Sequence, residues 1–257
     1  MIQDERAPFV RALQGARASA YAPGEFVGQE SFMGAAEIRK LAGRAGIAPG
    51  VSVLDLCCGI AGPGRFITRE LGCTYLGVDV SSSAVEIARE NAGALPCRFE
   101  VARVPPISFG PFDVVLLFET MLAFPDKETL LEEISRALLP GGRFAFTMEE
   151  GLPLTEAERE HMPDADTVWL TPLGEMLTCL ERVGLRVRWQ QDCSESHRAV
   201  AAALTGAFAT DATAIAGHIG RRALEDLLAA HRLWSDWLRE GRVRKLALVA
   251  EKTGTTG

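Results

Sequence analysis

The sequence lacks any long run of lysine or arginine, and its 27 basic residues are outnumbered by 34 acidic ones, for a formal net charge of -7. Affinity for nucleic acid comes chiefly from clustered positive charge, so a phosphate backbone is not the expected partner. The N-terminal stretch from Met1 to Gly24 also lacks an apolar segment of signal-peptide or membrane-spanning length. We therefore expect a cytoplasmic protein that binds neither nucleic acid nor a membrane.

Cysteine spacing typical of zinc sites is missing as well. The six cysteines form no CxxC pair and no Cys/His pattern suited to zinc, and several fall inside predicted core strands. We expect free, mostly buried thiols and no bound metal. The cysteines are Cys57, Cys58, Cys73, Cys97, Cys179 and Cys193.

What the chain does have is enough length and apolar content for a full core. Its 257 residues, 47% of them hydrophobic, fit one large domain or one domain with a modest insertion. Between residues 30 and 148, apolar strands alternate with amphipathic helices, which predicts a parallel sheet covered on both faces. The predicted strands are 51–56, 75–80, 98–101, 112–118 and 143–148, and the helices include 30–45, 81–91 and 126–138.

Beyond Met148 this alternation loosens. Residues 149–167 read as a polar loop or short helix, 172–183 as a helix, and 185–190 as a strand. An Ala/Leu-rich helical stretch follows over 194–240, and 243–251 closes as a strand. We therefore predict an N-terminal helical lid over 1–46, a main domain over 47–193 plus 241–252, and a helical substrate cap over 194–240.

A glycine-rich loop follows the first predicted strand. In open α/β sheets ligands bind at the carboxyl ends of strands, where glycines let the backbone approach them. Nicotinamide enzymes use G-x-G-x-x-G to seat a pyrophosphate, but the spacing here is reversed, Gly59-x-x-Gly62-x-Gly64. Asp55, just before the loop, would repel a pyrophosphate but could accept a hydrogen bond from an ammonium group. A cofactor with an amino-acid tail and a cation fits better.

A second carboxylate, Asp79 in GVDVS, ends the next predicted strand. It lies about 20 residues beyond the loop, where a ribose-binding acid is expected. Its oxygens can accept hydrogen bonds from both ribose hydroxyls. Such an Asp alone is common in turns and helix caps, but together with the loop it predicts a ribose site.

Four segments carry a family resemblance: VLDLCCGIAGPGRF, GVDVS, FDVVLLFETMLAFPD and RALLPGGRFAFT. In order and interval they resemble the motifs of class I S-adenosylmethionine-dependent methyltransferases, and within them small-molecule enzymes of natural-product and amine metabolism, including the sarcosine/dimethylglycine group. The resemblance implies a Rossmann-like, doubly wound α/β sheet of about seven strands, mostly parallel with the last antiparallel, and a helical cap before that strand. It implies S-adenosylmethionine as cofactor and S-adenosylhomocysteine as product.

The resemblance also assigns the cofactor contacts. Two departures stand out: Cys57 and Ala61 replace usual glycines, and Ala102-Arg103 stands where many members carry Gly-Asp for the adenine amine. The implied contacts are Asp55, Cys57, Gly59 and Ala61 for the methionine end, Asp79, Val80, Ala102 and Arg103 for ribose and adenine, Phe118 beside the methyl donor, and Gln29 in a lid that includes residues 28–32 and Tyr21.

Two residues are candidates for catalysis. Glu119 ends the fourth strand beside the expected methyl group, where it would act as a base or only orient the acceptor. His231 shares a helical face with Trp234 and Leu238 in LLAAHRLWSDWL, a face that either packs onto the domain or lines the acceptor pocket. A hydroxyl or acidic carbon acceptor needs a base, whereas an amine needs only a free lone pair. His161 and His197 lie in polar stretches and are expected to be exposed.

The leading functional prediction is methyl transfer from S-adenosylmethionine to O, N or C of a small molecule in secondary metabolism, by a monomer or homodimer. One alternative is a non-methylating cyclase or isomerase on the same fold, because fold does not fix function. Another is a methyltransferase acting on RNA or protein, which the acidic charge and the cap disfavour. The sequence does not identify the acceptor.

Overall fold

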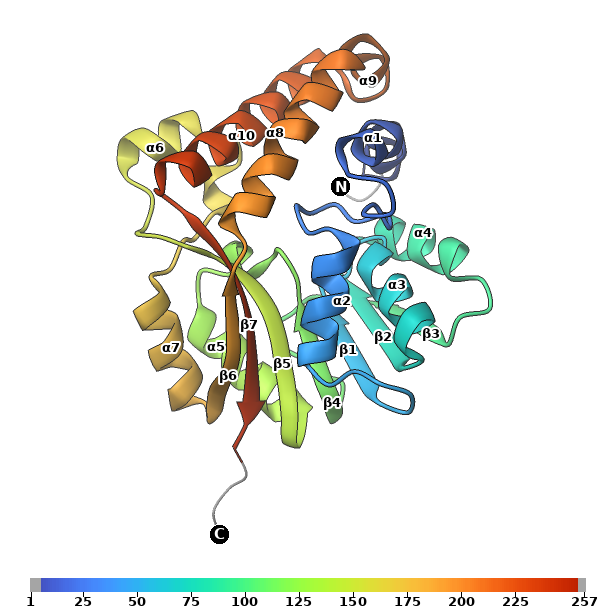
Figure 1. Cartoon of the computed structure of the whole chain (residues 1–257), viewed down its shortest axis with the longest axis vertical. Coiled ribbons are helices and arrows are strands. Elements are labelled where there is room, and N and C mark those ends of the chain that lie inside the picture. Colours follow the sequence, from blue (N-terminus) through green and yellow to red (C-terminus); the bar gives the residue numbers. More distant parts are fainter. Residues whose placement is uncertain (1–5, 254–257) are drawn as a thin grey trace.

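The computed structural model describes residues 6–253, so the first five residues of the expected 1–46 lid lie outside the described part. Its centre is a seven-stranded sheet in the order β3-β2-β1-β4-β5-β7-β6 (Figure 1). Only β7 runs antiparallel to its neighbours within this sheet. The expected fold class is thereby confirmed. The strands are β1 Ser52–Leu56, β2 Thr74–Asp79, β3 Cys97–Val101, β4 Phe112–Leu117, β5 Leu138–Glu150, β6 Leu185–Asp192 and β7 Arg244–Lys252.

Helices cover both faces of the sheet, as the continuous apolar strands predict. On one face α2, α3 and α4 pack over Val53 and Val114, and on the other α5 and α7 pack over Leu54 and Val115. Neighbouring residues of one strand therefore pack into the apolar cores on opposite faces of the sheet. The helices of these two layers are α2 Ala35–Arg44, α3 Gly62–Leu71, α4 Ser82–Ala92, α5 Lys127–Ala137 and α7 Leu173–Arg182.

A further group of helices lies beyond one end of the sheet (Figure 1). Helix α1 packs against α8 and α9 through a separate apolar cluster that includes Leu13, Leu204 and Phe208. A second small cluster joins the 151–170 segment to Trp237 of α10. The elements here are α1 Arg6–Ala20, η1 Met121–Ala123, α6 Glu156–His161, η2 Ala165–Thr167, α8 Ser194–Thr210, α9 Ala212–Ile219 and α10 Arg221–Glu240.

The segment before α2 differs from the sequence prediction. The helix begins at Ala35 instead of Glu30, and residues 27–34 form an irregular crossing segment. Its Gln29 side chain explains why, because it accepts from Val27 N at 2.6 Å and donates to the carbonyls of Glu25 and Met33. These bonds replace the helical ones and hold the segment against the strand ends.

Among the described helices none is long and apolar enough by itself to cross a membrane. Helices α8 and α9 reach that length and apolar content only as a pair, and they are bent by 82° at the break between them.

Candidate cofactor and acceptor site

The loop between β1 and α3 has an unusual backbone. Cys57, Gly59 and Ala61 all have positive φ, at 57°, 54° and 56°. This left-handed region favours glycine, because a Cβ crowds the following carbonyl there. The two residues that replace usual glycines therefore keep the glycine-like conformation, and they are small enough for the loop to retain its shape.

The other two glycines of the loop serve close packing. A Cβ on Gly62 would overlap the backbone of Gly28, and one on Gly64 would overlap the ring of Tyr75. Gly62 thus lets the 27–34 segment cross directly over the start of α3. Gly64 leaves room for the tyrosine that binds Asp55.

Asp55 lies at the end of β1, 4% exposed, and accepts a hydrogen bond of 2.5 Å from the Tyr75 hydroxyl. Burial raises its pKa to about 7 although the Tyr75 bond opposes the shift, and nearby Asp79 adds to it. A cationic group placed here would restore the ionised carboxylate.

Asp79 at the end of β2 is tied to both neighbouring loops. Its Oδ2 accepts from Gly59 N at 2.8 Å and its Oδ1 from Ser81 N at 2.9 Å. The side chain is 5% exposed. A carboxylate has about four lone-pair sites, so it can accept from several donors at once.

Two adjoining cavities lie at the carboxyl ends of these strands. They share Cys57 and Thr120, so they form one continuous cradle. The first, of about 260 Å³, is lined by Gly28, Glu30, Ser31, Asp55, Cys57, Cys58, Gly59, Ile60, Gly62, Pro63, Phe118, Glu119 and Thr120. The second, of about 290 Å³, is lined by Cys57, Asp79, Val80, Ala102, Arg103, Val104, Thr120, Ala123 and Phe124.

The structure thus brings most of the predicted cofactor residues to one cradle. Two differ: Ala61 is fully buried beneath the loop, and Gln29 is 1% exposed with its side chain bonded to the crossing segment. Neither of these side chains lines the cradle. Tyr21 also holds this segment, because its hydroxyl donates to the Ser31 carbonyl.

A third cavity, of about 290 Å³, lies under the helical group. It shares Glu30, Ser31 and Glu119 with the first cavity. Its wall combines apolar and aromatic residues with a few charged ones. The first group includes Phe32, Leu122, Met162, Val168, Leu204, Ala230, His231 and Trp234, and the charged residues include Arg17, Glu149, Asp164 and Lys245.

Glu119 stands at the junction of the first and third cavities. Its φ is 54°, and its backbone N–H donates to Thr147 Oγ1 at 2.6 Å. Strained backbone of this kind clusters at functional sites. Burial acts to raise the pKa of its carboxyl, but ion pairs with Lys245 and His197 outweigh burial and hold it at about 2.

Lys245 on β7 and Glu149 on β5 also line the third cavity and contact the Glu119 cluster, and the sequence does not predict this placement. The Lys245 ammonium lies 2.8 Å from Glu119 Oε2, also donates to Glu149 Oε1, and is 3% exposed. Burial lowers the pKa of Lys245, but the two carboxylates outweigh burial and raise it overall. One buried cation is thus shared by two buried anions.

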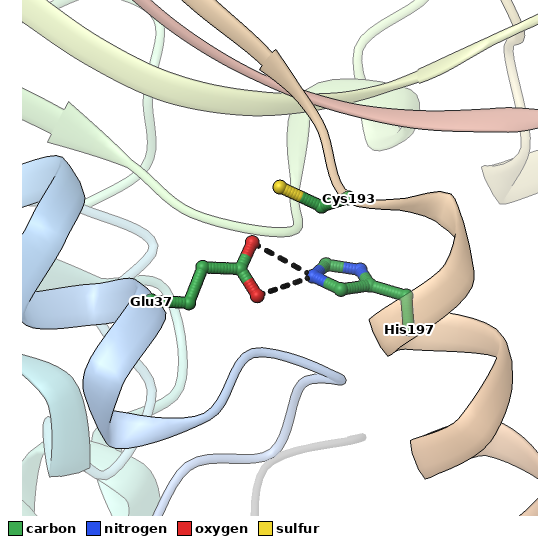
Figure 2. A group of neighbouring side chains, drawn as sticks. All are labelled: Glu37, Cys193 and His197. Atoms are coloured by element: carbon green, nitrogen blue, oxygen red, sulfur yellow. Dashed lines mark hydrogen bonds and ion pairs between the residues drawn. The ribbon is translucent and has the colours of Figure 1, made fainter.

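The expectation that His197 is exposed is wrong. It is fully buried in the first turn of α8, where its Nε2 lies 2.9 and 3.0 Å from the two Glu37 oxygens. Figure 2 shows the Cys193 thiol above this pair. The turn faces α2 instead of solvent, which the polar sequence around His197 concealed. His161, in contrast, is exposed as expected.

His231 lines the third cavity together with Trp234, on the predicted helical face. Its Nδ1 lies 2.8 Å from the Leu227 carbonyl. Because a carbonyl oxygen only accepts, Nδ1 carries the proton of the neutral ring and Nε2 carries a lone pair. Burial lowers the pKa of His231, against the Leu227 bond, so the ring is neutral at pH 7.

Comparisons with known proteins agree with this arrangement. Residues 53–142 match the family described as "Methyltransferase domain". Methyltransferase GfsG of Streptomyces halstedii is 33% identical over 109 residues, which cover 40% of this chain and 39% of that protein. Sterol 24-C-methyltransferase erg6 of Schizosaccharomyces pombe is 36% identical over 112 residues, covering 40% and 29%. The matches thus span well under half the length of these relatives.

Among solved structures, the cyclopropane synthase MmaA2 from Mycobacterium tuberculosis superposes with a TM-score of 0.82 at 14% identity, over 98% of this chain and 95% of that one. At this identity the likeness shows the fold. Residues 53–142 are therefore a methyltransferase domain, which supports the resemblance of the motifs to class I S-adenosylmethionine-dependent methyltransferases.

Proposed function

We propose that this chain transfers a methyl group from S-adenosylmethionine to O, N or C of a small molecule. The observation that carries the proposal is that the first and third cavities adjoin, because Glu30, Ser31 and Glu119 line both. A group held in one cavity would meet a group held in the other at this junction. The helices over 194–240 act, in this proposal, as the cap that selects the acceptor.

The cradle suits the parts of the cofactor. Asp79 would accept from the ribose hydroxyls, and Val80, Ala102 and Arg103 would border the adenine. Asp55 lies in the first cavity, where its carboxylate would offset the ammonium of the methionine end. Ala102 and Arg103 offer no carboxylate to the adenine amine, so backbone groups and packing would hold the ring.

The chain mainly contributes alignment and exclusion of water, because the cofactor supplies an already activated methyl group on sulfur. Glu119 would orient the acceptor and offset positive charge, since Lys245 holds its carboxylate in place. His231 would accept the acceptor's proton at Nε2, the ring nitrogen left with a lone pair. We place the reaction in the cytoplasm and in secondary metabolism, with a monomer or homodimer as the active unit.

The test uses radiolabelled S-adenosylmethionine and small-molecule extracts, with S-adenosylhomocysteine binding measured in parallel by calorimetry. We expect binding together with label on one or a few metabolites. The Glu119→Gln variant should lose label and keep binding, whereas Glu175→Gln, at an exposed position on α7, should change neither. Binding without any labelled product would favour a non-methylating reaction, and absence of binding would refute the proposal.

A further inference from the structure

Three potential metal ligands of different kinds lie close together near Glu119, beside the third cavity, which is the acceptor cavity of the proposed function. Glu37 comes from α2, while Cys193 and His197 are four residues apart at the start of α8. The thiol, the imidazole and the carboxylate each offer an atom within 4.8 Å of the other two (Figure 2). Cys193 is 4% exposed and His197 is fully buried, so both side chains are removed from solvent.

The second nitrogen of His197 provides an independent observation. Its Nδ1 lies 3.7 Å from Glu119 Oε1, and both atoms are buried without a hydrogen-bond partner among the described residues. A proton on Nδ1 would point toward the Glu119 carboxylate.

A cation on Nε2 would leave Nδ1 as the ring nitrogen that carries the proton. The ring proton would then reside on Nδ1 and point toward the Glu119 carboxylate. Histidine ligands of metals commonly donate their other N–H to a carboxylate in this way. The two unpartnered atoms, His197 Nδ1 and Glu119 Oε1, are thus placed as they would be beside a metal-bound His197.

We propose that Glu37, Cys193 and His197 form a site for a zinc-like divalent cation. Sulfur, nitrogen and oxygen ligands together suit Zn²⁺, whose bonds to them are about 2.0–2.3 Å long. The observed separations would close by small side-chain movements. A thiolate and a carboxylate balance the two positive charges.

The fourth coordination position would face the cavity lined by Glu37, Gln191 and Ser196, from which a water molecule can bind. On binding, the Cys193 thiol loses its proton to solvent and a sulfur–metal bond forms. A neutral imidazole ring would move its proton from Nε2 to Nδ1, and the thiol proton would then be the one proton released per metal bound. A protonated ring would release its Nε2 proton as well. The site would then fix Glu119 through His197, which links it to the acceptor cavity.

Cobalt(II) is the probe, added without oxygen to the metal-free full-length protein lacking a histidine tag. We expect one equivalent to bind with the absorption band of a thiolate–cobalt bond, and zinc to displace it. Cys193→Ser should abolish the band, and His197→Gln should weaken binding at least tenfold. Cys179→Ser, on α7 away from the site, is the matched control and should bind as the parent protein does.

Thermal unfolding separates binding from a general effect on folding. Zinc should raise the melting temperature of the parent protein and of Cys179→Ser, but not that of Cys193→Ser. Absence of a thiolate band in the parent protein would overturn the proposal. The same band and affinity in Cys193→Ser would also overturn it, because the cation would then bind elsewhere. These readouts do not depend on methyl transfer.

Discussion

The ammonium of Lys245 lies 2.8 Å from Glu119 Oε2, although β7 and the end of β4 are 126 residues apart in sequence. Lys245 also donates to Glu149, and all three groups are almost completely removed from water. The arrangement of Glu119 and Glu149 therefore depends on the buried Lys245 ammonium, which no local sequence pattern predicts.

Replacing Lys245 with methionine should destabilise the fold by about 3–5 kcal/mol, because two buried carboxylates would lose their common partner. Urea unfolding at pH 7 measures this. Lys40→Met, at an exposed position on α2, should change the free energy of unfolding by less than about 0.5 kcal/mol. Adding Glu149→Gln to Lys245→Met should recover part of the loss. Equal free energies of unfolding for Lys245→Met and Lys40→Met would contradict the buried ion pairs.

Asp79→Asn should weaken S-adenosylhomocysteine binding at least about 100-fold, since the amide nitrogen can no longer accept from a ribose hydroxyl or from Gly59 N. Calorimetry gives the affinity and circular dichroism verifies folding. Glu100→Gln, on the neighbouring strand with an exposed side chain, serves as the control. A folded Asp79→Asn variant with unchanged affinity would remove the ribose assignment.

Cofactor binding should release a proton below neutral pH, because the pKa of Asp55 is about 7 in the free protein and a bound ammonium favours the ionised carboxylate. Calorimetry at pH 6 in buffers of different ionisation enthalpy measures the proton count. The Asp55→Asn variant should release correspondingly less.

The same pKa affects stability. Folded Asp55 holds a proton that the unfolded chain releases between pH 3.8 and about 7. The contribution of this group to stability is therefore present at low pH and lost as pH rises through that window. Asp55→Asn should flatten this part of the stability curve, and an unchanged slope would show that Asp55 is ionised in the free protein.

His231→Gln should lower turnover by about 10²–10⁴-fold if the acceptor carries a proton that must leave. Because burial lowers the pKa of His231, kcat/KM of the parent protein should fall only below pH about 6.5. The variant should lose that acidic limb and keep its affinity for S-adenosylhomocysteine. A variant that retains the limb would assign it to another group.

Ala61→Gly should stabilise the protein by up to about 1 kcal/mol, since alanine has a φ of 56° there. Ala203→Gly, in the exposed middle of α8, should instead cost about 0.5–1 kcal/mol. Chemical denaturation of the two variants provides the comparison. A loss of stability at position 61 would show that the Ala61 methyl group contributes more by packing than its backbone costs.

The sequence predicts those features of the structure that depend on residues close together in the chain. Val53, Leu54 and the loop after them belong to one local pattern, so the strand, the turn and the positions of Asp55 and Asp79 follow from it. The family resemblance implies Gln29 as a cofactor contact, but its amide bonds to the backbone around it.

His197 and Glu37 show the opposite limit. They lie 160 residues apart, and their contact exists only because α8 packs against the chain near α2. The polar sequence around His197 indicates exposure, and a search for local Cys/His spacing does not include Glu37. Only the tertiary structure brings these groups together.

The crossing segment over residues 27–34 lies between the first and third cavities, with Gly28 on the first, Phe32 on the third, and Glu30 and Ser31 lining both. Under the proposed function, any displacement of this segment that admits the cofactor would also open the wall of the third cavity. We then expect an ordered cycle in which the cofactor enters before the acceptor and departs after the product.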